Sequence, residues 1–137
     1  MNIRKKNSLR PGFALLLLLP LLLTACGSGG EIELDINDSG SQVEVEKGQV
    51  LVISLESNPS TGYSWDVMEI DESILKQDGE SEFISSQSGD IVGAGGVEIL
   101  RFETTGVGTT YLELGYRRVW EEDVAPLMLY TLSVVVR

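Results

Sequence analysis

Apolar and polar residues alternate in short stretches along residues 31–137, the pattern of β-strands that bury one face. Clusters of Gly, Asn, Ser, Asp and Lys separate these stretches and indicate turns. The pattern predicts seven strands, within residues 32–36, 43–46, 49–56, 63–68, 97–104, 110–116 and 127–136. One further stretch, Asp71 to Lys76, is typical of a single helical turn, with Asp71 or Ser73 as its cap.

Seven short strands without a long helical period predict an all-β fold, an immunoglobulin-like antiparallel β-sandwich of about seven strands. Trp65 is expected in the core of this sandwich. The chain has one cysteine, so the disulfide of antibody domains is absent and packing alone has to hold the sheets together. Residues 31–137 form one predicted domain.

The first 25 residues have the pattern of a secretory signal peptide. Four basic residues precede an apolar run, Phe13 to Leu23, which Pro20 interrupts and which is too short to span a bilayer as a helix. The sequence Leu23-Thr24-Ala25-Cys26 resembles a bacterial lipoprotein box, in which Cys26 is lipidated and begins the mature protein. An ordinary signal peptide with an incidental thiol is the alternative.

This pattern predicts a lipoprotein signal peptide at residues 1–25 and a lipidated Cys26 with a flexible tether at residues 26–30. Two or more acyl chains would hold such a protein on a membrane almost permanently, since one chain binds only marginally. We therefore expect a lipid-anchored protein of the cell envelope on the extracytoplasmic side, facing the periplasm or the cell surface.

The acidic balance of the chain restricts its partners. The formal charge is −11, and the part after Cys26 holds six basic against 21 acidic residues, a charge of −15. Nucleic acids and anionic membrane surfaces are bound by clustered Lys and Arg, so this balance excludes both kinds of binding. With no histidine and one cysteine, the chain also lacks the side chains for most nucleophilic and zinc chemistry. We expect no catalytic residue, no metal site and no cofactor.

The connection Asn58-Pro59-Ser60-Thr61-Gly62-Tyr63 joins two strong strand patterns and has the composition of a stiff loop. Pro59 fixes its own φ, and Gly62 permits a positive φ. Small polar residues, Ser60 and Thr61, lie between them, and a stiff polar tip loses less entropy on binding than a mobile one. The alternative is a plain tight turn, which uses the same residue types.

A second connection runs from Phe83 to Gly96 and ends in Gly93-Ala94-Gly95-Gly96. It is not a dinucleotide-binding fingerprint, because Glu98 stands where that motif has glycine and no helical pattern follows. Its glycines fit a loop whose backbone lies close against a partner, and a disordered connector is the alternative.

A third connection begins with Tyr116-Arg117-Arg118-Val119-Trp120 and continues into the acidic residues 121–123. Trp and Arg are the residue types that most often dominate the binding energy of interfaces. In the alternative, Trp120 belongs to the core and the two arginines pair with the acids that follow.

At these three places the chain resembles the chagasin-type inhibitors of cysteine peptidases. That family carries Asn-Pro-Thr-Thr-Gly-Tyr, Gly-x-Gly-Gly and Arg-Pro-Trp (or Phe) motifs on three loops at one end of an immunoglobulin-like fold. Here Ser60 replaces the first threonine, residues 93–96 match fully, and Val119 replaces the proline. Without the fixed φ of that proline, Trp120 is expected to be held less firmly.

The resemblance implies that the three loops form a wedge that enters the active-site cleft of a papain-like cysteine peptidase. Inhibition would be reversible and competitive, with Thr61 nearest the catalytic thiolate and histidine of the target and the other two loops against the cleft walls. The inhibitor domain, residues 31–137, is expected to be a monomer. The implied target-binding residues are Asn58, Pro59, Ser60, Thr61, Gly62, Tyr63, Gly93, Gly95, Gly96, Arg118 and Trp120.

Three other functions compete with this interpretation. An enzyme is disfavoured, because the acids are more simply a solvated surface than an acid–base pair. A calcium loop has a partial match, although strand patterns flank it and Gln42 stands where an apolar residue is usual, which favours a β-turn. A surface lipoprotein that binds another protein, in adhesion or assembly, is the third competitor. The residues of the calcium pattern are Asp35, Asn37, Ser39, Gly40 and Glu46.

Overall fold

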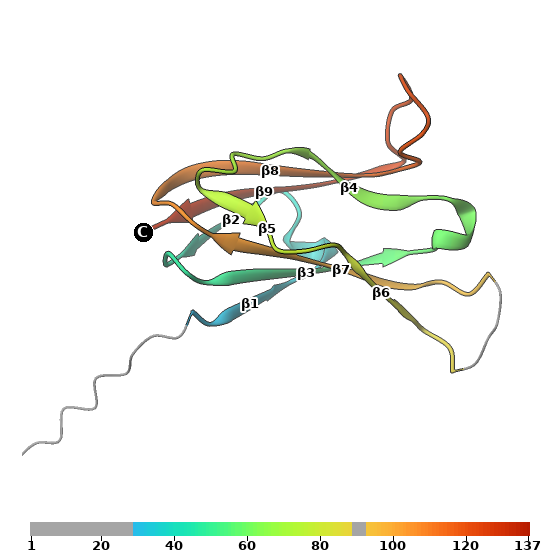
Figure 1. Cartoon of the computed structure of the whole chain (residues 1–137), viewed down its shortest axis with the longest axis horizontal. Helices are drawn as coiled ribbons and strands as arrows, with labels where there is room; N and C mark the ends of the chain where they lie inside the picture. Colours follow the sequence, from blue (N-terminus) through green and yellow to red (C-terminus); the bar gives the residue numbers. More distant parts are fainter. Residues whose placement is uncertain (1–28, 89–92) are drawn as a thin grey trace, which may run out of the picture.

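The computed structural model describes residues 29–88 and 93–137, which fold into a two-layer β-sandwich (Figure 1). The predicted signal peptide and Cys26 lie outside the described residues. The strands are β1 (Glu31–Leu34), β2 (Ser41–Val45), β3 (Val50–Ser57), β4 (Ser64–Glu69), β5 (Leu75–Gln77), β6 (Glu82–Ser85), β7 (Gly96–Thr104), β8 (Gly108–Arg117) and β9 (Met128–Val136). Two 3-10 helices, η1 (Ile36–Asp38) and η2 (Pro59–Thr61), lie in the connections.

One sheet has the strand order β1-β3-β7-β5, with β6 also paired to β7, and the other has the order β2-β9-β8-β4. The predicted all-β sandwich is confirmed. Most strand pairs are antiparallel, and the exceptions are two edges, where β1 pairs with β3 and β2 with β9 in parallel. The chain leaves β1 through η1 and enters the opposite sheet at β2, so no hairpin forces either strand to run against its neighbour.

All seven predicted strands are present, and two short ones were not predicted. The stretch Asp71 to Lys76 does form a turn, in which the Leu75 N–H donates to the Asp71 carbonyl at 2.9 Å and the Ser73 N–H to the Asp71 carboxylate at 3.0 Å. The helical prediction fails beyond this turn, because Leu75 and Lys76 belong to β5. The loop predicted from Phe83 also begins later, since residues 82–85 pair with β7 as β6.

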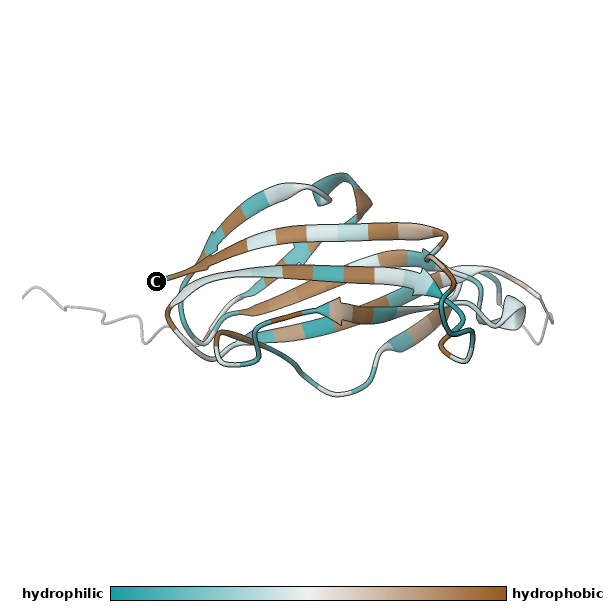
Figure 2. Cartoon of the chain, turned by 90° about the horizontal axis from the view of Figure 1, so that it is seen from above, coloured by the Kyte–Doolittle hydropathy of each residue, from teal (hydrophilic) through white to brown (hydrophobic). Residues whose placement is uncertain are grey.

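The core lies between the inward faces of the two sheets. Alternate residues of the long strands are buried in it. Figure 2 shows the corresponding alternation of hydrophobic (brown) with paler or hydrophilic (teal) positions along the ribbons. Trp65 is buried as predicted, with 4% of its surface exposed. Complete burial of each large aliphatic or aromatic side chain contributes about 1.5–3 kcal/mol. The fully buried members include Leu51, Ile53, Leu55, Leu100, Phe102, Leu112, Leu114, Tyr130, Leu132 and Val134.

One carboxylate lies among these apolar side chains. Glu98 of β7 is 3% exposed, and its two oxygens accept hydrogen bonds from the backbone N–H of Trp65 at 3.1 Å and the Ser81 hydroxyl at 2.7 Å. Trp65 belongs to β4, an edge strand of the opposite sheet. Glu98 therefore links the two sheets by a polar contact in addition to their packing.

The two ends of the sandwich carry different segments of the chain. The β3–β4, β6–β7 and β8–β9 connections emerge at one end, while β1 begins and β9 finishes at the other (Figure 1). The described residues include no helix that is long and apolar enough to cross a membrane.

We predict that Glu98→Ala lowers the free energy of unfolding by about 1–3 kcal/mol, because the Trp65 N–H is left buried without an acceptor. Glu98→Gln should recover most of this loss, since its amide can accept from Trp65 and donate to Ser81. Glu103→Ala, at an exposed position of the same strand, should change stability by less than about 0.5 kcal/mol. Urea unfolding followed by circular dichroism measures all three, and equal values for the two alanine variants would contradict the prediction.

Candidate functional site

The three connections singled out in the sequence meet at one end of the sandwich (Figure 1). The β3–β4 connection contains Asn58–Tyr63, the β6–β7 connection ends in the glycine motif, and the β8–β9 connection begins with Arg118. Residues 89–92 of the second connection lie outside the described residues. The structure therefore brings together the residues of all three motifs, although they are up to about 60 positions apart in the chain.

The first loop, residues 58–63, is a single 3-10 turn with its own internal hydrogen bonds. The Thr61 and Gly62 amides donate to the carbonyls of Asn58 and Pro59 at 3.1 and 2.9 Å. Gly62 has φ +82°, the left-handed conformation that favours glycine. The tight-turn alternative thus describes the backbone correctly, and the turn exposes Pro59, Ser60 and Thr61 at its tip.

Side chains add further restraints within this loop. The Thr61 hydroxyl donates to the Asn58 carbonyl at 2.6 Å, and the Ser60 hydroxyl donates to the Asn58 Oδ1 at 2.5 Å. This bond uses only the hydroxyl of Ser60, so it does not require the methyl group that threonine would add.

The second loop touches the first at its base. The Asn58 Nδ2 donates to the Gly93 carbonyl at 3.3 Å, and Gly93 itself has φ +90°. Gly95 accepts hydrogen bonds from the amide and hydroxyl of Ser86, at 3.1 and 2.6 Å, across the β6–β7 hairpin. Gly96 pairs with Ser85, and a Cβ at position 96 would collide with the Ile84 carbonyl oxygen. Gly96 is therefore required by the hairpin itself.

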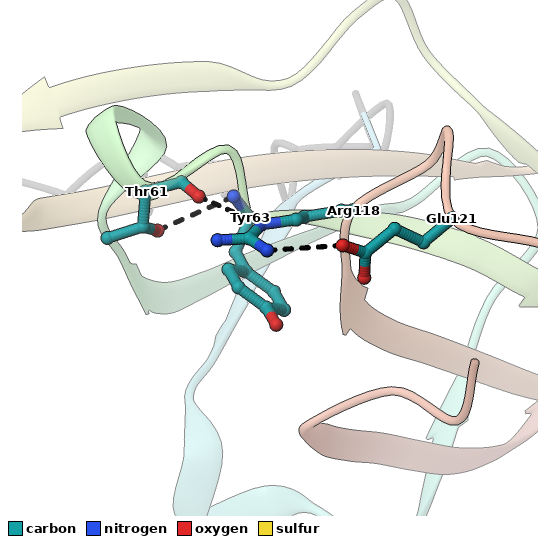
Figure 3. Close-up of polar contacts among 4 residues, drawn as sticks. All are labelled: Thr61, Tyr63, Arg118 and Glu121. Atoms are coloured by element: carbon teal, nitrogen blue, oxygen red, sulfur yellow. Dashed lines mark hydrogen bonds and ion pairs between the residues drawn. The ribbon is translucent and has the colours of Figure 1, made fainter.

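The third loop is held to the first by Arg118 (Figure 3). Its Nε donates to the Thr61 carbonyl at 3.0 Å, and its Nη1 forms an ion pair with Glu121 at 3.1 Å. Its guanidinium carbon lies 4.6 Å from the centre of the Tyr63 ring, a cation–π distance. Arg118 thus fixes the first and third loops relative to each other.

Trp120 is not a core residue, since 65% of its surface is exposed. Its ring packs against the backbone of the first loop, where a Cβ at Gly62 would lie 2.5 Å from the Trp120 Cη2. This packing restrains Trp120 in the absence of the motif proline, while Val119 beside it is exposed. The sequence-based alternative was right for one arginine, because Arg118 pairs with Glu121, and wrong for Arg117, which pairs with Asp66 of β4 at 2.7 Å.

The prediction did not include Tyr116 and Glu121, which the structure places in contact with the motif residues. The Tyr116 hydroxyl accepts the Asn58 N–H at 2.9 Å, and its ring lies 5.4 Å from that of Tyr63. A sequence signal existed for Tyr116, which ends a strand pattern directly before the third motif. No local signal showed that its partner would be Asn58, which is 58 residues away.

The segment with the calcium pattern forms η1 and the turn that follows it. The Asp35 carboxylate accepts the backbone and side-chain N–H groups of Asn37 at 2.7 and 2.9 Å, and Asp38 accepts the Asp35 N–H at 2.8 Å. These bonds are a reciprocal cap of a 3-10 helix. Across residues 29–88 and 93–137, no three His, Cys, Asp or Glu side chains are grouped in a way that could hold a metal ion.

Comparison with known proteins agrees with this geometry. The sequence model described as chagasin family peptidase inhibitor I42 matches residues 44–134. The chain belongs to the chagasin family of peptidase inhibitors. The curated relative Amoebiasin-2 of Entamoeba histolytica is 33% identical to this family member over 96 residues, which cover 69% of the chain and 76% of the relative.

Solved structures of similar proteins show the same fold. The crystal structure of the cysteine protease inhibitor EhICP2 from Entamoeba histolytica has a TM-score of 0.69 at 28% identity, covering 79% of this chain and 96% of EhICP2. The solution structure of Amebosin has a TM-score of 0.64 at 30% identity, covering 81% of this chain and all of Amebosin. The two-sheet architecture described above is therefore that of the chagasin family.

We predict that Gly62→Ala is more disruptive than Gly79→Ala. Both glycines have a positive φ, +82° and +74°, so alanine costs each about 1–2 kcal/mol of conformational strain. At Gly79 a Cβ meets nothing within 4 Å, whereas at Gly62 it meets the Trp120 ring. Gly62→Ala should therefore displace Trp120 and increase the quenching of tryptophan fluorescence by acrylamide, because the other tryptophan, Trp65, is buried. Equal quenching in the two variants would contradict this packing.

Proposed function

We propose that the domain inhibits papain-family cysteine peptidases reversibly and competitively, by inserting its three loops into the active-site cleft of the target. The protein is a peptidase inhibitor by family, and its similarity to the cysteine protease inhibitor EhICP2 supports cysteine peptidases as the targets. In this proposal the domain is not an enzyme and acts as a monomer.

The observation that carries the proposal is the assembly of the three loops before any partner binds. Asn58 joins the first loop to the second, and Arg118 joins the first to the third. Fixing loops in advance reduces the conformational entropy that binding would otherwise cost. An exposed turn of Pro59, Ser60 and Thr61 beside the exposed Trp120 gives the end a narrow polar tip and an aromatic anchor.

The proposed mechanism needs no covalent chemistry. Thr61 enters the centre of the cleft, nearest the catalytic thiolate and histidine of the target, and excludes substrate from them. Gly93 and Gly95 present backbone without side-chain bulk to one wall, and Trp120 packs against the other. The Arg118 bonds to Thr61 and Glu121 support this role from within the domain and keep the tip in position.

We predict that residues 27–137 inhibit papain competitively at sub-micromolar concentration, which corresponds to more than about 8 kcal/mol of binding free energy. Thr61→Asp should weaken inhibition by at least about 30-fold, the effect of losing an interface hot spot. It removes the hydroxyl that donates to Asn58 and places a negative charge beside the target thiolate. Steady-state titration of papain and of a cathepsin-L-like enzyme measures the inhibition constants of the wild type and of Thr61→Asp.

The matched control is Thr109→Asp, which adds the same charge at an exposed position of β8 near the opposite end of the sandwich. It should leave the inhibition constant unchanged. If the folded wild-type domain inhibits neither peptidase, the proposed function is wrong and a surface role with another protein partner becomes the better hypothesis.

We also propose that Cys26 carries a lipid anchor that holds the domain on the extracytoplasmic side of the cell envelope. The lipoprotein-box pattern at residues 23–26 supports this. The described chain enters β1 at the end of the sandwich opposite the three loops (Figure 1). A domain tethered through residues 26–30 would therefore direct its inhibitory end away from the membrane.

Expression of the full chain in a bacterial host with labelled palmitate tests the anchor. The wild type should incorporate label and sediment with membranes, and Cys26→Ser should do neither, because the acylated thiol is gone. An unlabelled wild-type protein that is exported and cleaved would instead indicate an ordinary signal peptide.

A further inference from the structure

Tyr116 occupies a position beneath all three loops without belonging to any of their exposed surfaces. It is the penultimate residue of β8, and only 8% of its surface is exposed. Its ring contacts those of Tyr63 and Trp65, with centroid distances of 5.4 and 5.2 Å. Its hydroxyl accepts the Asn58 N–H at 2.9 Å.

Asn58 is the residue on which the first two loops converge. Its backbone carbonyl accepts from both the amide and the hydroxyl of Thr61, and its side chain contacts Ser60 and Gly93. Apart from the bond to Gly93, these bonds lie within the first loop and do not attach it to the second sheet. The Tyr116 hydroxyl contacts the N–H of Asn58 and thereby attaches this set of bonds to a long central strand of the second sheet.

The same side chain supports the third loop through its ring. The Tyr63 ring contacts the Tyr116 ring and also lies 4.6 Å from the Arg118 guanidinium carbon. Arg118 in turn bonds to the Thr61 carbonyl and to Glu121. A series of tilted aromatic contacts thus connects the buried Trp65 through Tyr116 and Tyr63 to Arg118 of the third loop.

We infer that Tyr116 is a positioning residue for inhibition: its hydroxyl sets the first two loops through Asn58, and its ring sets the third through Tyr63. This inference rests on the proposed function of the loops. The role is indirect, because a side chain so deeply buried cannot form a substantial contact with a target. Without the hydroxyl, the Asn58 N–H loses its acceptor and the first loop has to be ordered during binding, at a cost in affinity.

The test compares Tyr116→Phe with Tyr130→Phe. Tyr130 is a buried tyrosine of the adjacent strand β9, opposite Leu114, and its hydroxyl has no hydrogen-bond partner among the described residues. Both variants therefore remove one buried hydroxyl and keep the ring, but only the first removes a bond to a loop. Val136→Ala, near the other end of β9, serves as a variant that lowers overall stability far from the loops.

Two measurements are made on each variant: the inhibition constant for papain, and the amide hydrogen exchange of residues 58 and 60–62 in the free protein, Pro59 having no amide hydrogen. Tyr116→Phe should weaken inhibition by about fivefold to tenfold, the effect of one lost hydrogen bond, and should accelerate exchange in this segment. Tyr130→Phe and Val136→Ala should leave the inhibition constant within about twofold of the wild type.

An unchanged inhibition constant in Tyr116→Phe would overturn the inference, as would an equal loss in all three variants, which would indicate a general effect of stability. If the folded wild type inhibits neither papain nor the cathepsin-L-like enzyme, the proposed function fails separately, and the exchange measurement alone tests the role of the hydroxyl. Exchange of residues 58 and 60–62 that is unchanged in Tyr116→Phe would then show that the hydroxyl does not order the loop.

Discussion

The packing of the two sheets against each other is the interaction on which the rest of the structure depends. The chain has a single cysteine, so no disulfide within it can join the sheets. Close-packed side chains such as Phe102 and Tyr130, both fully buried, have to fix the strands instead. The core holds the strand ends in place, and the strand ends determine the relative positions of the three loops. The polar bridge from Glu98 to Trp65 strengthens the same arrangement beside the first loop.

Several motif residues have intramolecular roles that account for their identity before any partner is considered. Gly62 adopts a positive φ and makes room for Trp120, Gly96 permits the β6–β7 pairing, and Arg118 joins two loops. These motif residues therefore determine the shape of the loop surface as well as forming part of it. Arg101, Arg117, Arg118 and Arg137 each form an ion pair with a carboxylate of the domain.

The sequence predicted the features that depend on local patterns. Alternation located seven strands, because each of them buries one face, whereas β6 escaped notice because all four of its residues are exposed and Phe83 and Ile84 are adjacent. Alternation also carries no information on strand direction, so the parallel edges could not be inferred. The three motifs were found from residue types and order, but their mutual contacts depend on pairs such as Thr61 and Arg118, which are 57 residues apart. The exposure of Trp120 likewise depended on the fold of its loop and not on its neighbours in sequence.

The compact form of the first loop also affects its survival beside a peptidase. A chain held in a catalytic cleft is a potential substrate, and cleavage of a folded loop requires local opening first. Opening residues 58–62 would break the two backbone hydrogen bonds of η2 and detach Asn58 from both Gly93 and Tyr116. These bonds lower the population of the extended form that could be hydrolysed. In the proposed binding mode, the turn that forms the narrow tip would therefore also slow cleavage of the loop by the target.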